Sequence, residues 1–576
     1  MQTELEKNIY QTQEKNNILG SESVILSLLA EGIDTIFGYP GGAIMPIYDA
    51  LYDYQDKLNH MLVRHEQGAI HAAQGYARAS GRVGVCFATS GPGATNLLTG
   101  IADAQIDSTA VVCITGQVPS HLLGTDAFQE TDIIGIAKPV TKWSYQVTDP
   151  DEIPEIIAKA FYIAKSGRPG PVLVDITKDA QIKKCNFKYK KCERIRSYQP
   201  YPKFTEESIE QAVDLINNSK KPFIVYGQGI TISGAENELI EFVEKTGIPA
   251  GWTIMGLSSM PTNHPLNVGM LGMHGNYSPN VKTNDCDLLI AIGMRFDDRV
   301  TGDLNRYAKQ AKIIHIEIDK AEINKNVTVD VAINSDAKIA LKELTKRVEV
   351  NSHDSWVKEF RDLDKMEFEK VIEPETHPKQ GKIKMAEVIK IISDLSNGEA
   401  IIVTDVGQHQ MIAMRYYNFK KNRSNITSGG FGTMGFALPA AIGAKVAMPD
   451  RHVISVSGDG GFQMTLQELG TIFQYKVPVK ILILNNHFLG MVRQWQQLFF
   501  EKRYSFTEMV NPDFITIAKG FSIQAKQVNE REDLQSSIQE MLDSKSSYLL
   551  EVVVEKEDNV FPMVPSGESV SNIRLS

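Results

Sequence analysis

The chain has 576 residues, of which 42% are hydrophobic and 23% are charged, and its formal net charge is −10. This composition is typical of a globular protein, and at about 100–200 residues per domain the length predicts several domains. The negative charge argues against nucleic acid or an anionic membrane as a partner. No run of about 18 apolar residues exists, so no membrane-spanning helix is expected.

Residues 1–20 are polar and contain Glu4, Glu6 and Glu14. A secretory signal would need an apolar stretch there and a transit peptide would avoid acids, so we expect a disordered arm on a cytoplasmic protein. The five cysteines form no CxxC pair. Free thiols in a reducing compartment are the expected state.

Residues 21–182 alternate between strand and helix patterns. We expect a helix capped by Ser21, strands at 35–37, 61–63, 83–88 and 110–115, and a helix after Glu66. That helix has Ala69, Ile70, Ala73 and Ala77 on one face. Repeated strand–helix–strand units predict a parallel, doubly wound α/β sheet.

Two further α/β regions follow. A basic, cysteine-containing stretch at 183–196 precedes a second region, 200–345, with strands expected at 222–226, 288–292 and 312–318. Residues 346–382 are highly charged and are expected to form a solvated helix and linker. A third region is expected at 383–555, followed by a C-terminal tail at 556–576. The predicted fold is therefore three doubly wound parallel-sheet domains.

The sharpest motif is Gly458-Asp459-Gly460, followed 24 residues later by Asn485-Asn486. A strand at 453–457, a helix at 463–475 and a strand at 479–484 form one βαβ unit, which makes the two strands parallel. Asp459 and Asn486 then lie at the edge of the sheet where ligands bind. Carboxylate and amide oxygens suit Mg²⁺ or Ca²⁺ together with phosphates. Asp459 as a plain helix cap is the alternative, but the paired Asn favours a metal–diphosphate site.

This spacing is similar to the thiamine diphosphate signature, and the chain resembles the catalytic subunits of the acetolactate synthase (acetohydroxyacid synthase) family. The resemblance covers about residues 20–567. It is carried by FGYPGGAI (37–44), ATSGPGATN (88–96), GTDAFQE (124–130), MRFDDRVTG (294–302), GFGTMGFALPAAIGA (430–444) and LGMVRQW (489–495). It implies a pyrimidine-binding domain (21–182), a central FAD-binding domain (200–345) and a diphosphate-binding domain (383–555).

The resemblance implies roles for residues around the cofactor. Glu66 would hydrogen-bond the pyrimidine ring and drive removal of the thiazolium proton; by position alone it would more often be a surface residue in the first turn of a helix. Met434 would hold the cofactor in its bent conformation, and the metal would be bound by Asp459, Asn486 and the Phe488 carbonyl. The remaining residues that would contact the cofactor are Val406, Gly407, Gln408, His409, Gly432, Gly458 and Gly460.

FAD and substrate contacts are likewise implied only by the resemblance. The FAD residues would be Arg168, His274, Arg295, Glu317 and Asp336. The substrate funnel would contain Gln129 and Lys178 as catalytic residues, with Asp298, Arg299, Met491, Val492 and Trp495. A guanidinium such as that of Arg299 can pair with a 2-keto acid carboxylate, whereas an exposed Asp–Arg pair is an equal alternative. A single Trp usually only packs, but the motif around Trp495 favours contact with the acceptor.

The activity implied is decarboxylation of pyruvate and transfer of the two-carbon unit to a second pyruvate or to 2-ketobutyrate. The products, 2-acetolactate and 2-aceto-2-hydroxybutyrate, lead to valine, leucine and isoleucine. A homodimer or homotetramer with sites between subunits, a small regulatory subunit and a non-redox FAD are also implied. The alternatives are a flavin-using pyruvate oxidase and a non-catalytic regulatory subunit; intact Glu66, Asp459 and Asn486 argue against the second. Glu568 departs from the small residue common in this family.

Overall fold

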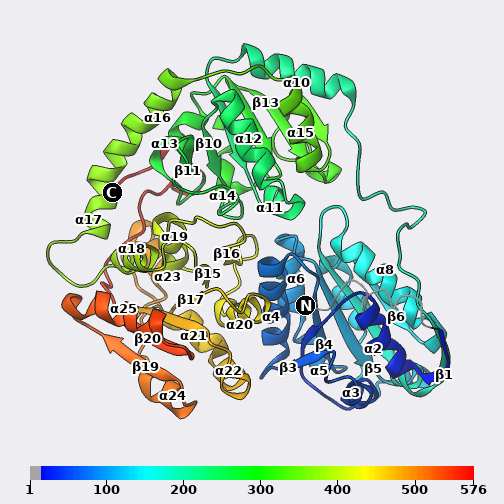
Figure 1. The fold of residues 1–576 in the computed structure, drawn as a ribbon. Helices are drawn as coiled ribbons and strands as arrows, with labels where there is room; N and C mark the ends of the chain where they lie inside the picture. Colours follow the sequence, from blue (N-terminus) through cyan, green and yellow to red (C-terminus); the bar gives the residue numbers. More distant parts are fainter. Residues whose placement is uncertain (1–13) are drawn as a thin grey trace.

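The computed structural model describes residues 14–576. Within that range the chain folds into three lobes, each built on a six-stranded sheet in which all neighbouring strands are parallel. Figure 1 shows the first lobe in blue and cyan, the second in green and the third in yellow to red. The predicted three-domain α/β architecture is confirmed. Among the described residues, no helix has the length and apolarity needed to cross a bilayer.

The first lobe contains the strand–helix alternation expected near the N-terminus. Its central strands are buried along their whole length, as parallel strands covered by helices on both faces should be. In sheet order its strands are β3 (Asn59–Leu62), β2 (Thr35–Gly38), β4 (Gly84–Ala88), β5 (Val111–Gln117), β7 (Pro171–Thr177) and β6 (Trp143–Val147). Its helices are α2 (Gly20–Ala30), α3 (Met45–Tyr52), α4 (Glu66–Ser80), α5 (Pro92–Thr95), α6 (Leu98–Ile106), α7 (Ile133–Ala137), α8 (Ile153–Lys165) and α9 (Lys178–Ile182).

The second lobe is the central one in the sequence. In sheet order its strands are β11 (Asn267–Met270), β10 (Ala250–Trp252), β9 (Pro222–Tyr226), β12 (Leu288–Ile292), β13 (Lys312–Glu317) and β14 (Val331–Asn334). Its helices are α10 (Glu206–Asn218), α11 (Gly229–Ser233), α12 (Glu236–Thr246), α13 (Tyr277–Thr283), α14 (Asp298–Thr301) and α15 (Ala337–Arg347). The strands expected at 222–226 and 288–292 have these bounds in the structure.

The third lobe contains the predicted βαβ unit. In sheet order its strands are β16 (Asn425–Thr427), β15 (Ile401–Thr404), β17 (Val453–Gly458), β18 (Lys480–Asn485), β20 (Tyr548–Val553) and β19 (Gln524–Val528). Its helices are α18 (Met385–Leu395), α19 (Gln408–Tyr416), α20 (Ala437–Ala447), α21 (Asp459–Thr465), α22 (Leu469–Tyr475), α23 (Gly490–Phe499), α24 (Phe514–Gly520) and α25 (Leu534–Asp543). The prediction of one continuous helix at 463–475 is wrong, because the structure has two helices there, α21 and α22. A 3-10 turn at Leu466–Glu468 separates them, and the Glu468 carboxylate there accepts the backbone N–H of Arg64 at 3.0 Å.

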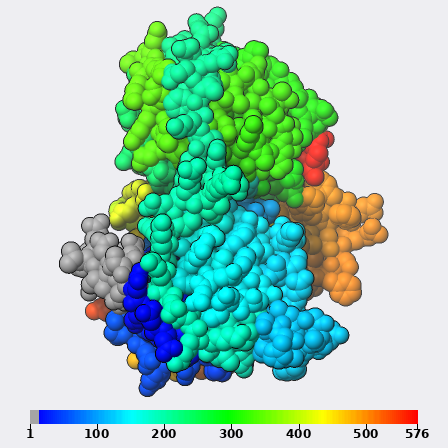
Figure 2. Space-filling view, turned by 90° about the vertical axis from the view of Figure 1, so that its right-hand side faces the viewer, coloured from blue at the N-terminus to red at the C-terminus, as the bar shows by residue number. Residues whose placement is uncertain are grey.

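The N-terminal expectation needs two corrections. Residues 1–13 of the expected disordered arm lie outside the described range, but Glu14–Leu19 form strand β1, which pairs antiparallel with β8 (Lys184–Lys188). Helix α2 begins at Gly20 after Leu19 and has no side-chain cap, so Ser21 is not the predicted cap. Residues 189–205 then pass over the surface from the first lobe to the second, as the teal band in Figure 2 shows.

The charged segment between the second and third lobes is mostly helical. It contains α16 (Asp354–Glu367), a π-helical turn at Phe368–Ile372 and α17 (Glu373–Thr376). Trp356 and Phe360 are buried in a cluster with Phe223 of the second lobe. The helix is therefore solvated on one face only, and its other face belongs to the second lobe.

Helices α4 and α20 join the first and third lobes. A Cβ at Gly75 of α4 would overlap the Ala440 carbonyl, and a Cβ at Gly443 of α20 would overlap the Ala72 carbonyl. The two backbones are therefore in direct contact. One buried apolar cluster extends through this crossing and includes side chains of both lobes. Since α4 begins with Glu66, this contact helps fix where Glu66 lies.

Candidate active site

Asp459 and Asn486 lie at the carboxyl ends of the adjacent parallel strands β17 and β18, which are in register at Gly458 and Leu484. Both side chains are buried. One Asp459 carboxylate oxygen, Oδ2, accepts the Asn511 amide at 2.7 Å, while Oδ1 is buried without a hydrogen-bond partner among the described residues. Burial raises the pKa of Asp459. A buried carboxylate oxygen with no donor suits a hard cation.

Asn486 is tied to its neighbours through both ends of its amide. Its Oδ1 accepts the backbone N–H of Phe488 at 3.2 Å, and its Nδ2 donates to Oε1 of Gln408 at 3.2 Å. No cluster of three or more His, Cys, Asp or Glu side chains suited to a metal occurs in residues 14–576. A cation beside Asp459 would therefore complete its shell with amide, backbone and phosphate oxygens. The ligand roles of Asn486 and the Phe488 carbonyl stay predictions.

The loop from Val406 to His409 leads from β15 into α19. Gly407 has φ +151°, and the His409 ring packs so closely that a Cβ on Gly407 would be 2.8 Å from its Cε1. A Cβ on Gly458 would likewise be 2.9 Å from the His409 Nδ1, so the ring brings the two glycine turns together. Burial lowers the pKa of His409 to about 3, and the neutral ring leaves Nε2 without a partner in the described chain.

A second loop, residues 428–436, connects β16 with α20 and contains Gly432 and Met434. Gly432 and Gly435 have φ +72° and +85°, a conformation that glycine adopts without strain. The buried Asp405 carboxylate accepts the backbone N–H groups of Gly435, at 3.0 Å, and of Ala437, at 3.3 Å. Burial raises the pKa of Asp405 to about 6. Asp405 therefore fixes the loop on both sides of Phe436, a role that sequence reasoning missed.

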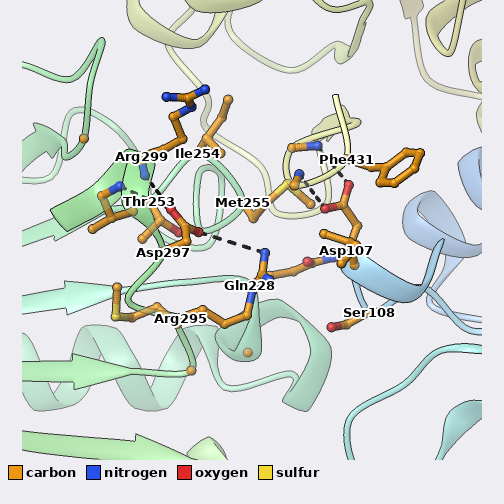
Figure 3. A pocket seen from close by; sticks show the side chains of 18 of the residues that line it. Asp107, Ser108, Gln228, Thr253, Ile254, Met255, Arg295, Asp297, Arg299 and Phe431 are labelled. Atoms are coloured by element: carbon orange, nitrogen blue, oxygen red, sulfur yellow. Dashed lines mark hydrogen bonds and ion pairs between the residues drawn. The ribbon is translucent and has the colours of Figure 1, made fainter. Parts of the chain in front are cut away.

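A cavity of about 1200 Å³ lies where the three lobes meet. Figure 3 shows side chains of all three converging on it, among them Asp107, Arg295 and Phe431. Its volume exceeds the roughly 300–1,000 Å³ of ordinary small-molecule pockets. The predicted site residues that line it are Val406, Gly407, Gly432, Met434, Arg168, His274, Arg295, Glu317, Asp336, Asp298, Arg299, Met491, Val492 and Trp495.

The residues expected around FAD occupy the second-lobe side of this cavity. Glu317 ends β13 and Asp336 follows β14, at the strand ends where α/β sheets bind ligands. Burial raises the pKa of Glu317 to about 7. The Arg168 guanidinium forms ion pairs with Asp319 at 3.1 Å and Glu322 at 2.9 Å, which the sequence did not predict. The acids Glu317 and Asp336 can accept hydrogen bonds from hydroxyl groups, and the arginine can donate to phosphate, so this wall fits a ligand that carries both.

His274 belongs to a buried network that reaches the charged helix. Burial, with Arg415 nearby, lowers the pKa of His274 to about 4, and its Nδ1 has no partner within the described range. Arg415 of α19 donates to the Gly275 carbonyl at 2.8 Å and pairs with Glu367 at the end of α16. Through Arg415, the loop beside His274 is thus fixed to the end of α16 and to the third lobe.

Helix α23 forms the third-lobe wall of the cavity. Met491, Val492 and Trp495 lie on its cavity side. The Gln494 Oε1 accepts both the Gln408 amide at 3.0 Å and the Val560 N–H at 2.8 Å, which fixes the helix beside the loop at residues 406–409. Across the cavity, Arg299 and Asp298 form an exposed pair at 3.5 Å. The exposed pair that was the alternative for Arg299 is therefore present in this structure.

Other predicted residues lie outside the cavity lining. Glu66 is buried at the start of α4 and accepts the Asn96 amide at 2.9 Å. Gln129 has φ +59°, with its carbonyl oxygen 2.8 Å from where a Cβ on Gly91 would lie. Lys178 begins α9 directly after β7. A separate group lies at the carboxyl ends of β17 and β18 and adjoins the cavity at Gly407, which lines it and precedes Gln408: Gln408, His409, Gly458, Asp459, Gly460, Asn486 and Phe488.

Models of thiamine pyrophosphate enzymes match the chain in the order of its lobes. The N-terminal TPP binding domain matches residues 19–136, the central domain 209–344 and the C-terminal TPP binding domain 405–552. Together with the buried Oδ1 of Asp459, which has no partner among the described residues at the strand ends of the third lobe, these matches define the class of protein as a thiamine diphosphate-binding enzyme.

Curated relatives narrow this class. The chain is 46% identical over 568 residues to the probable acetolactate synthase large subunit of Methanocaldococcus jannaschii, covering 96% of this chain and 95% of that protein. It is 45% identical over 555 residues to acetolactate synthase isozyme 2 large subunit of Escherichia coli, covering 96% and 99%. For the acetolactate synthase large subunit of Corynebacterium glutamicum the values are 47% over 570 residues, 97% and 90%. The chain belongs to the family of acetolactate synthase large subunits.

Proposed function

We propose that this protein is the catalytic subunit of an acetolactate synthase. It decarboxylates pyruvate and transfers the two-carbon unit to a second pyruvate or to 2-ketobutyrate. The products are 2-acetolactate and 2-aceto-2-hydroxybutyrate, precursors of valine, leucine and isoleucine. The observation that carries the proposal is the cavity of about 1200 Å³ between the lobes, which is lined by Gly432 and Met434, by the acids Glu317 and Asp336, and by Met491, Val492 and Trp495 of α23.

We propose thiamine diphosphate with Mg²⁺ and a non-redox FAD as the cofactors. The unpartnered Oδ1 of Asp459 supports a metal at that position, with Asn486 and the Phe488 carbonyl as further ligands. When bound, the thiazolium ring supplies the electron sink that decarboxylation of a 2-keto acid requires. Arg168, His274, Arg295, Glu317 and Asp336 would hold FAD, whose ribityl, diphosphate and ribose groups, between its two ring systems, offer hydroxyl and phosphate oxygens for contact.

The protein's own residues would then bind, orient and move protons. Glu66, buried and held by Asn96, would exchange a proton with the cofactor's pyrimidine ring. Arg299 would pair with the carboxylate of the keto acid, and Met491, Val492 and Trp495 would cover the acceptor's alkyl group and exclude water. Gln129 and Lys178 would contact the reacting groups.

We further propose that active sites form between two copies of the chain, in a homodimer or homotetramer. In a single chain, Glu66, Gln129 and Lys178 do not line the cavity that Gly432 and Met434 line. A second copy would bring its own Glu66, Gln129 and Lys178 to the site. Relatives named as large subunits support a small regulatory partner. Five free cysteines support work in a reducing compartment, the cytoplasm.

One assay tests the activity. Purified protein is incubated with pyruvate, thiamine diphosphate, Mg²⁺ and FAD without oxygen, and the products are resolved by chromatography. Acetolactate in half the molar amount of pyruvate consumed, with one CO₂ released for each acetolactate formed, is the expected result. Acetaldehyde, acetate or acetyl phosphate as the main product would overturn the proposal.

A further inference from the structure

The loop at residues 428–436 contacts all three lobes, although it belongs to the third. A Cβ on Gly430 would overlap Ile106 of the first lobe and would be 3.0 Å from the guanidinium of Arg295 in the second. A Cβ on Gly429 would overlap Met255. A loop so rich in glycine loses much conformational entropy when it is fixed, so it needs strong anchors to keep one shape.

Two buried carboxylates, Asp103 of helix α6 and Asp107 directly after that helix, supply these anchors at the N-terminal end of the loop. Asp107 accepts the backbone N–H of Gly429 at 2.8 Å and that of Gly430 at 2.7 Å. One helical turn earlier, Asp103 accepts the hydroxyl groups of Ser428 and, at 3.0 Å, of Thr433. Both carboxylates are almost completely buried, and Figure 3 shows Asp107 reaching the loop that bears Phe431.

Arg78 of α4 holds this arrangement from the other side. Its guanidinium pairs with Asp107 at 2.9 Å and also donates to the Thr427 carbonyl, just before the loop. Hydrogen bonds that involve a buried charge contribute more than neutral ones, and a carboxylate can accept several at once. Cation, carboxylates and backbone amides therefore form one network between the first and third lobes.

We propose that Asp103 and Asp107 are positioning residues that hold the loop at 428–436 in the shape needed to bind thiamine diphosphate. The inference rests on the proposed function, because Gly432 and Met434 on this loop are the expected cofactor contacts. Asp405 anchors the C-terminal end of the same loop from its own lobe. The first lobe thus fixes the shape of a loop of the third lobe in the same chain. The two carboxylates act through the loop and need not touch the cofactor.

Asp107→Asn tests the proposal, since the amide keeps the shape but replaces one acceptor by a donor facing N–H groups. Binding of thiamine diphosphate with Mg²⁺ is measured by calorimetry on the FAD-containing protein. We expect the Kd to rise at least tenfold, and the amides of Gly429 and Gly430 to exchange faster with deuterium in the unliganded protein. An unchanged Kd with unchanged exchange would overturn the proposal, as would an unchanged Kd with lowered melting temperature, which is the signature of a purely structural role.

The matched control is Asp34→Asn. Asp34 also pairs with an arginine, Arg82 at 2.6 Å, which lies two residues after the end of α4, but Asp34 makes no hydrogen bond to residues 428–436. We expect this variant to lower the melting temperature without changing the Kd. A Kd that rises as much as in Asp107→Asn would show that any broken Asp–Arg pair of the first lobe has this effect, and would contradict the specific role of Asp107.

A second pair of variants decides the matter even if Asp107→Asn does not fold. Thr433→Val keeps the size of the side chain but removes the hydroxyl donated to Asp103, whereas Thr433→Ser retains it. We expect weaker cofactor binding in the first and restoration in the second; equal values in both would contradict the proposal. A wild-type chain that bound no thiamine diphosphate would refute the proposed function instead, and protection of the Gly429 and Gly430 amides would then still decide whether the carboxylates hold the loop.

Discussion

Asn511 holds one oxygen of the Asp459 carboxylate at 2.7 Å, while the other oxygen has no donor in the described part of the chain. The amide orients the carboxylate and leaves its second oxygen directed to a ligand. We expect Asp459→Ala to weaken Mg²⁺-dependent binding of thiamine diphosphate by on the order of a hundredfold or more, since even residues behind metal ligands cost 10–100-fold. The melting temperature of the unliganded variant should not fall, because the substitution removes a buried carboxylate whose burial is unfavourable in the folded state. Calorimetry with and without Mg²⁺ measures both; equal affinity in variant and wild type would exclude Asp459 as a ligand.

Glu66→Gln keeps the hydrogen bond with Asn96 but removes the acid. We expect exchange of the thiazolium proton for deuterium in bound cofactor to slow by about 10²–10⁴-fold, the usual contribution of acid–base catalysis. The pyruvate KM should change little. The exchange is followed by proton NMR after acid quench. Glu369→Gln, an exposed change on the segment that follows α16, is the control and should exchange at the wild-type rate. Wild-type exchange in Glu66→Gln would refute the role.

FAD is expected to remain oxidised during turnover. Acetolactate formation has no net redox change, whereas a pyruvate oxidase reduces its flavin once per pyruvate. Under argon, the visible absorbance band of the oxidised flavin should stay constant while acetolactate accumulates. Bleaching of the band in proportion to pyruvate consumed, with acetate as product, would identify the oxidase instead.

Glu317 should make stability depend on pH. Burial raises its pKa in the folded protein to about 7, above the ordinary value of 4.5, so the folded state holds the proton more tightly than the unfolded state. Its stabilising contribution is complete below about pH 4.5 and is lost as the pH rises through 7. Between pH 5.5 and 8 the loss is about 2 kcal/mol. In FAD-free protein, Glu317→Gln should narrow the difference in melting temperature between these pH values. An identical difference in wild type and variant would contradict this.

Trp495→Leu should change the choice of acceptor. Pyruvate and 2-ketobutyrate differ by one methylene, whose burial contributes about 0.8 kcal/mol, or roughly fourfold. We expect the variant to retain pyruvate self-condensation but to lose preference for 2-ketobutyrate by about that factor, measured as product ratio in mixtures of both acids. Phe499→Leu is the control, because Phe499 contacts the Trp495 ring at 5.4 Å without lining the cavity. If both products fell equally in Trp495→Leu, the tryptophan would be a packing residue.

The part of the site that follows local pattern could be predicted. Asp459 and Asn486 each follow an apolar strand of one βαβ unit, so strand direction alone places them at one edge. Asp103 and Asp107 could not be found in this way, because their partners lie in another lobe, with Ser428 325 residues beyond Asp103. Their only local signal is a pair of acids one turn apart, at the end of a short helix that is mostly apolar. Strand β1 was missed for a similar reason: the first four residues of Glu14–Leu19 are polar, and only its pairing with β8 makes it a strand.

The backbone contact between α4 and α20 limits how this sequence can change over evolutionary time. Runs of alanine and glycine usually look permissive, since small residues make few side-chain contacts. At Gly75 and Gly443 the opposite holds, because even a methyl group would overlap a carbonyl of the facing helix. A substitution at either position would have to be compensated in a different lobe, several hundred residues away. The two lobes are therefore expected to diverge together, and a lobe grafted from a distant relative would need its facing helix grafted with it.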